Sequence, residues 1–160
     1  MSFIGGIVGS VFMDITEEKM AKAGIYSGVN AAYVGRWVSG FMKGILFHQD
    51  ISDAAPVNNE IRIGRVFHFV VGGGVVALFY PVLIELLAFE QPYNHLLSAT
   101  VFGLVTSLLP WFILMPSFGW RLFGTRAPEG ARPFISPVLS HIPYGFGIGL
   151  TLVIYYSIVA

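Results

Sequence analysis

Ionisable residues interrupt several otherwise apolar stretches of this sequence. Asp14 and Glu18 follow an apolar amino-terminal segment, and His68 and His141 each lie inside a long apolar run. His48 lies outside these runs, where a loop could bring it back to the same region. Ionisable side chains are costly inside a membrane, so a group of them at one depth predicts that they satisfy one another. We therefore treat these five residues as one candidate polar site.

Imidazole and carboxylate groups together allow three kinds of site. Asp14, His68 and His141 could ligate a divalent metal, because neutral His nitrogens and carboxylate oxygens suit zinc or iron. The same groups could relay protons along a solute pathway, since His titrates near neutral pH. A hydrogen-bonded structural network is the third interpretation. The sequence has no HExxH motif and no pair of His residues four apart, so no motif favours the metal.

A second group of candidates is basic. Arg36, Arg62, Arg65 and Arg126 could contact phosphate, either of a lipid head group or of a soluble substrate. They could equally serve only to fix the orientation of the chain in a membrane. The net charge is zero, so charge gives no argument for nucleic acid as a partner. Phosphate-binding loops, nucleophile elbows and dinucleotide fingerprints are absent.

The composition predicts that these side chains are positioned by membrane-spanning helices. Hydrophobic residues make up 55% of the 160 residues and charged residues 11%, against about 25% charged in soluble domains. A helix needs about 20 mostly apolar residues to cross a bilayer. Such segments lie at 2–22, 61–87, 96–117 and 135–159. We expect an all-α polytopic membrane protein, a bundle of four transmembrane helices forming one domain over residues 1–160.

The basic residues predict how this bundle is oriented. All nine Lys and Arg residues lie in or beside the first and third loops. Basic loops stay cytoplasmic, which places both termini on the outer side of a bacterial inner membrane. Asp14, His68 and His141 then fall in the cytoplasmic third of the membrane, where we expect them to converge. Glu18 or His48 would be additional members of that group.

The first loop contains a further helical pattern at residues 31–47. Aromatic and aliphatic residues alternate there with polar ones at helical spacing. This amphipathic pattern predicts a helix lying in the cytoplasmic interface of the membrane. A re-entrant segment is the alternative interpretation.

Short landmarks along the chain suggest a family. They include Met13-Asp14, Val34-Gly35-Arg36-Trp37, Pro110-Trp111-Phe112, and His141 ahead of Gly145. With them the chain resembles a bacterial family of small membrane proteins known only as a domain of unknown function. The resemblance implies four helices and places Asp14, Arg36, His68 and His141 at landmark positions. It implies no activity.

Three functions remain open on these grounds. The first is an accessory or structural membrane subunit, since the chain is small and has no recognised catalytic motif. The second is a membrane metal-binding protein or enzyme built on the His and Asp residues. The third is a small transporter that works as an oligomer, because four helices enclose little space. The expected partners are the lipid bilayer and either another protein or a second copy of the chain.

Overall fold

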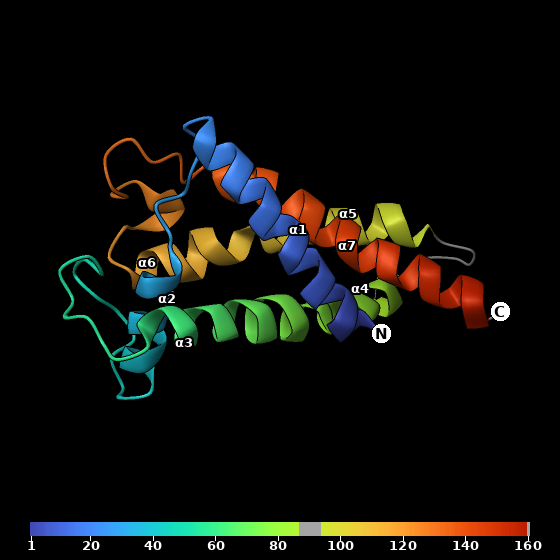
Figure 1. Cartoon of the computed structure of the whole chain (residues 1–160), viewed down its shortest axis with the longest axis horizontal. Coiled ribbons are helices and arrows are strands. Elements are labelled where there is room, and N and C mark those ends of the chain that lie inside the picture. The colour runs from blue at the N-terminus through green and yellow to red at the C-terminus, as the bar shows by residue number, and fades with distance from the viewer. Residues whose placement is uncertain (87–93, 160) are drawn as a thin grey trace.

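The computed structural model describes residues 1–86 and 94–159, and within these residues every regular element is a helix. The elements are α1 (Ser2–Lys22), α2 (Ala31–Phe41), α3 (Glu60–Val66), η1 (Phe67–Val75), α4 (Phe79–Leu86), α5 (His95–Thr106), η2 (Pro110–Leu114), α6 (Met115–Ser117), η3 (Leu122–Gly124) and α7 (Ser136–Val159) (Figure 1). The prediction of an all-helical fold is confirmed.

Three helices within the described residues are long and apolar enough to cross a membrane. They are Glu60–Leu86, His95–Ser117 and Ser136–Val159, which correspond to the second, third and fourth of the predicted spans and keep those names below. Many large apolar side chains on them are exposed, as expected for helices that face lipid. These helices support a membrane protein. Residue 87 of the predicted second span and residue 160 lie outside the described residues.

The helix α1 differs from these three. It has 21 residues, but its second half carries charged residues, and it lies outside the set that meets the length and hydropathy criteria. It packs along α7 and crosses η1, and its first residues lie at the same end of the molecule as the carboxyl terminus (Figure 1).

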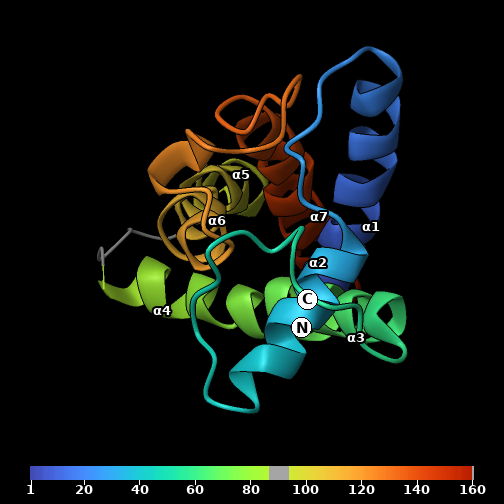
Figure 2. The same cartoon turned by 90° about the vertical axis from the view of Figure 1, so that its left-hand side faces the viewer.

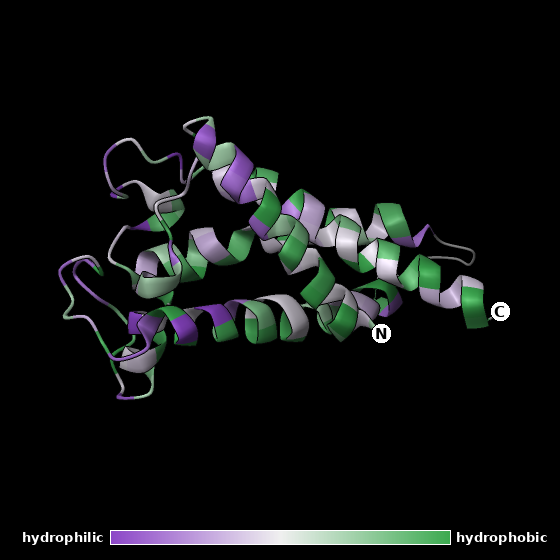
Figure 3. Cartoon of the chain, in the orientation of Figure 1, coloured by the Kyte–Doolittle hydropathy of each residue, from purple (hydrophilic) through white to green (hydrophobic). Residues whose placement is uncertain are grey.

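The two ends of the molecule have different compositions. Hydrophobic residues follow the spans, whereas hydrophilic residues gather at the end that carries α2 and the loops (Figure 3). Viewed from that end, α2 lies against α3 and α1 runs beside α7 (Figure 2). We call this the loop end; both chain termini lie at the opposite end.

Glycines allow the helices to pack closely. A Cβ on Gly6 of α1 would collide with the carbonyl of Gly73 in η1, and one on Gly147 of α7 would lie 2.5 Å from the Cα of Gly9. On the other side of α7, Gly145 approaches the backbone of α5 in the same way. Small residues at such contacts let membrane helices approach backbone to backbone. These contacts hold α1, η1, α5 and α7 together.

The predicted helix at 31–47 is shorter in the structure. It begins at the cap residue Asn30, whose side chain accepts a hydrogen bond from the Tyr33 N–H, and it ends at Phe41. The N–H groups of residues 43 and 45 then both bond to the Gly40 carbonyl, and Gly44 has φ of +82°. A left-handed glycine just beyond a helix commonly ends it. The prediction was therefore wrong for residues 42–47, which form an exposed apolar turn.

An ion pair joins α2 to the start of the second span. Arg36 donates from Nε to Glu60 Oε2 at 2.7 Å and from Nη2 to Oε1 at 3.0 Å. Its Nη1 donates to the Ala54 carbonyl at 3.1 Å. Beside this pair, Gly35 and Gly64 bring the two backbones into contact. Two-point Arg–carboxylate pairs fix orientation as well as distance, so α2 and α3 form one unit.

The loop end has its own core, made of Val34, Ile51, Trp111, Met115, Phe118 and Trp120. The indole N–H of Trp120 donates to Asp50 Oδ1 at 3.3 Å. Partial burial opposes ionisation of Asp50, but hydrogen bonds from Ser52 and Trp120 outweigh it and lower the pKa of this carboxyl group. This loop-end core packs α2 and the loops against the last turns of the third span.

Candidate functional site

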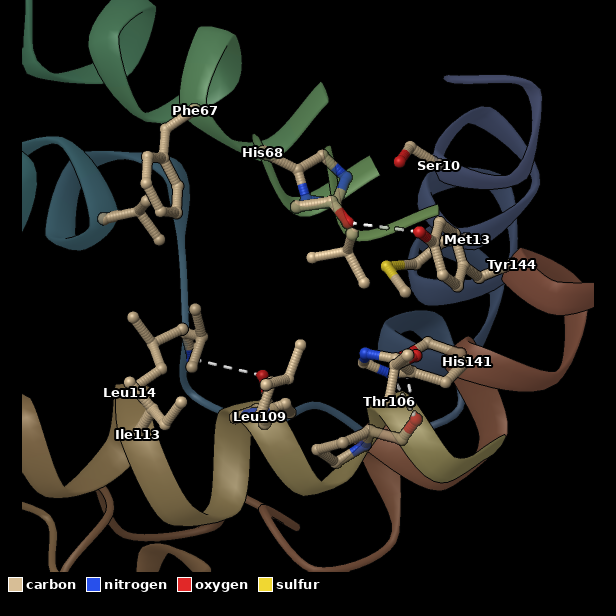
Figure 4. Close-up of a pocket in the computed structure, with 18 of the residues that line it drawn as sticks. Ser10, Met13, Phe67, His68, Thr106, Leu109, Ile113, Leu114, His141 and Tyr144 are labelled. Carbon is tan, nitrogen blue, oxygen red and sulfur yellow. Dashed lines mark hydrogen bonds between the residues drawn. The ribbon is translucent and has the colours of Figure 1, made fainter. Parts of the chain in front are cut away.

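A cavity of about 360 Å³ lies among the helices, with its largest walls on the second and third spans (Figure 4). Ligand cavities for small molecules commonly have volumes of about 300–1,000 Å³. Most of the lining is apolar, including Phe67, Val71, Leu109, Ile113 and Leu114. The cavity is therefore large enough and apolar enough for the body of a small hydrophobic molecule.

Both large walls include a π-helical stretch that lines part of the cavity. The stretch η1 contributes Phe67, His68 and Gly72, and η2 contributes Pro110 and Ile113. Pro110 has no backbone N–H and so weakens the regular helical bonding around it. Widened π turns inside α-helices occur frequently at functional sites.

Tyr144 of α7 fixes the wider turns of η1. Its hydroxyl donates to the Gly73 carbonyl at 2.7 Å and lies 3.3 Å from the Gly72 carbonyl. The Gly73 carbonyl also accepts from the Val76 N–H, so the tyrosine adds a second donor to it and ties α7 to η1. The same tyrosine also lines the cavity.

The polar part of the lining comes from α1, η1 and α7. His68 Nε2 lies 3.0 Å from Asp14 Oδ1, an ion pair when the ring is protonated. The angles at this contact are not those of a hydrogen bond, so the ring and the carboxylate attract each other only through their charges. Asp14 is half exposed on α1, whereas His68 lines the cavity. Two of the three predicted central residues therefore meet.

The third residue, His141, lines the same cavity from α7. Its Nδ1 is 2.7 Å from the Pro137 carbonyl, a distance at which Nδ1–H donates. The hydroxyl of its neighbour Ser140 approaches the carboxylate of Glu17, which also lines the cavity and lies near His68. Sequence reasoning missed Glu17 as a central residue. Glu17 is seven residues from Ser10, which places both on one face of the helix, and this spacing could have indicated that Glu17 faces inward.

Other predicted residues lie away from this cavity. Glu18 points outward and pairs with Lys22 at 2.7 Å on an exposed surface. His48 packs against Gly40 of α2 and is not in the cavity lining. Arg36 is engaged by Glu60, and the remaining arginines of the predicted phosphate-binding group, Arg62, Arg65 and Arg126, are exposed at the loop end.

Ser10 is a buried polar residue that the rest of the chain leaves unsatisfied. It is 1% exposed, and within the described residues its hydroxyl makes no hydrogen bond. It lines the cavity, and Figure 4 shows it across from His68. Buried hydroxyls nearly always have a partner, so an unpaired one marks this contact between α1 and η1 as unusual.

Comparison with known proteins identifies the family. A family model described as protein of unknown function DUF2938 matches residues 3–155. The chain belongs to this family. The expected membership of a domain-of-unknown-function family is thereby confirmed. No curated protein and no solved structure matches the chain.

The metal prediction is not supported in this DUF2938 chain. Within residues 1–86 and 94–159, no group of three or more His, Asp or Glu residues is arranged to hold a metal ion. The physical reason lies in the partners that the ligands already have. His141 directs Nδ1 to the Pro137 carbonyl, and Asp14 faces His68 from a half-exposed position. The polar wall is better described as a group of charged and hydroxyl side chains on one side of an apolar cavity.

Proposed function

We propose that this DUF2938 protein is a four-span inner-membrane protein that binds an amphipathic molecule between its second and third spans. One observation carries the proposal: an apolar cavity of about 360 Å³ has hydroxyl, imidazole and carboxylate groups on one wall. The apolar walls suit the body of the ligand, and the polar wall suits its head. A few placed polar groups in a mainly apolar lining are typical of ligand sites.

A purely structural subunit would account for the glycine contacts but not for this cavity. Protein interiors are close-packed, so a recess of this volume leaves its apolar lining without packing partners on one side. A ligand that fills the space would supply those partners. Binding of this kind is also the first step that a transporter would need.

Filling the cavity from Gly72 tests the proposal. A Cβ there meets no atom closer than 3.9 Å, so Gly72→Leu adds a side chain to the cavity without a backbone collision. We expect it to reduce ligand labelling about tenfold or more, because displacing ligand volume forfeits its apolar burial. The measurement uses a photoactivatable fatty alcohol in phosphatidylcholine nanodiscs. Saturable labelling of Met13 and Ile113 is then mapped by mass spectrometry.

The matched control is Val70→Phe, which adds bulk on the same helix. Val70 is exposed and outside the cavity lining, so labelling of Met13 and Ile113 should be unchanged. Labelling that does not saturate with unlabelled alcohol, or that survives in Gly72→Leu, would contradict ligand binding in the cavity.

The proposed topology counts α1 as the first span. Its 21 residues are about 30 Å long at 1.5 Å per residue, which matches the hydrocarbon core. The basic residues belong to the loop end and the adjoining helix ends, whereas both termini lie opposite, so the positive-inside rule makes the loop end cytoplasmic. The exposed turn at 42–47 would then lie in the cytoplasmic interface, with its apolar side chains toward lipid.

Cysteine labelling tests this orientation. The chain has no cysteine of its own, so single substitutions give clean sites. In cells with a permeabilised outer membrane, Ile158→Cys should react with an impermeant thiol reagent, whereas Glu129→Cys should react only after lysis. The opposite pattern would reverse the topology. Reaction of both residues, or protection of both, in sealed cells would contradict a cytoplasmic loop end with outer termini.

A further inference from the structure

The charges on the cavity wall are unevenly compensated. Glu17, His68 and His141 line the cavity, and no Lys or Arg is among the described lining residues. His68 lies 3.0 Å from Asp14, so a charge on its ring is offset by that carboxylate. Glu17 has Ser140 as a hydroxyl neighbour but no fixed cation on the wall. A carboxylate in an apolar environment is stabilised by a cation close to it.

We propose that the cavity selects cationic amphiphiles, molecules that carry an ammonium or other onium group on an apolar body. This inference rests on the proposed ligand-binding function and names the class of ligand. The Glu17 carboxylate would pair with the cation.

The aromatic lining fits the same ligand class. Trp37, Phe67 and Tyr144 all line the cavity. Ring faces attract cations, and this attraction strengthens where water is excluded. An anionic amphiphile would instead meet the Glu17 carboxylate, with no Lys or Arg of the described lining to offset it. The basic residues that could attract an anion lie at the loop end and not in the cavity lining.

Tetraphenylphosphonium and tetraphenylborate have nearly the same shape but opposite charges, so comparing them separates the effect of charge from that of size. Tritiated tetraphenylphosphonium is bound to the protein in phosphatidylcholine nanodiscs, and unlabelled tetraphenylphosphonium or tetraphenylborate is added as competitor. We expect saturable binding of the cation, displaced by the unlabelled cation and at least tenfold less effectively by the anion. Glu17→Gln should weaken binding about tenfold or more, because it removes the charge and keeps the shape. Glu17→Asp should retain most of the affinity.

The control is Glu18→Gln, the neighbouring acid on the same helix. Glu18 is exposed and paired with Lys22, so its loss should leave the affinity for tetraphenylphosphonium unchanged. Equal binding to wild type and Glu17→Gln, or equal competition by the two ions, would overturn the inference. If that happens while the fatty alcohol still labels the cavity, ligand binding stands and only cation selectivity is wrong. If neither probe enters, both proposals fail.

Discussion

Replacing Trp120 with Ala is expected to lower the free energy of unfolding by about 3–5 kcal/mol, the range for deleting a large buried aromatic side chain. Trp120 is fully buried in the loop-end core. Phe118 and Tyr33 pack edge-to-face with its ring, at distances of 5.2 and 6.0 Å between ring centroids. Alanine would leave a void that these rings cannot fill without moving the loops. The measurement is unfolding in sodium dodecyl sulfate followed by circular dichroism.

Trp120→Phe serves as the control for this variant. It keeps an aromatic ring but loses the N–H that donates to Asp50. We expect a smaller loss, about 1–3 kcal/mol, because most of the packing remains and Asp50 keeps its hydrogen bonds from Ser52. Equal losses for the two variants would show that the hydrogen bond, and not the packing of the ring, stabilises the loop end.

The second large effect is expected for Gly145→Ala. A Cβ at this position would collide with the Ala99 carbonyl and lie 2.8 Å from the Thr100 Cα and 2.9 Å from the Gly103 Cα. All three are backbone atoms, so no side-chain rotation relieves the overlap and α5 must move away from α7. Overpacking of this kind costs about 1–3 kcal/mol, and sometimes more. The expected result is a lower denaturant midpoint in the same unfolding assay.

Gly72→Ala is the matched control because it makes the same change at an open position. Its Cβ would have no contact closer than 3.9 Å. Gly costs a helix about 0.5–1 kcal/mol relative to Ala, so this variant should be as stable as the wild type or slightly more stable. A midpoint for Gly145→Ala at or above that of Gly72→Ala would contradict the close packing of α5 on α7.

The amino-acid sequence carried much of the information about the helices, for a clear physical reason. Long apolar runs bounded by charged or glycine-rich segments produce strong helical signals, and the structure has helices at Glu60–Leu86, His95–Ser117 and Ser136–Val159. The end of α2 was not predictable in the same way. Whether a helix passes through Gly40 or stops beyond it depends on the left-handed backbone at Gly44, which sequence patterns do not specify.

The candidate site was only partly predictable. Depth in the membrane follows from position along a helix, so Asp14, His68 and His141 could be assigned to one level. Which side of α1 faces inward depends on its rotation, and that is set by the contacts of Gly6 and Gly9. This rotation turns Glu17 to the cavity and leaves Glu18 on the exposed surface. The π-helical stretches at Phe67–Val75 and Pro110–Leu114 were not predicted either, because apolar periodicity does not distinguish π from α hydrogen bonding.

The ion pair between Arg36 and Glu60 has a mechanical consequence. Because the guanidinium holds the carboxylate at two points, α2 cannot tilt without carrying the start of the second span with it. Beyond its last residue α2 leads into the apolar turn at 42–47, and α3 continues into Phe67 and His68 on the cavity wall. The ion pair, together with the backbone contact of Gly35 and Gly64, therefore couples the position of this exposed turn to that of the cavity wall.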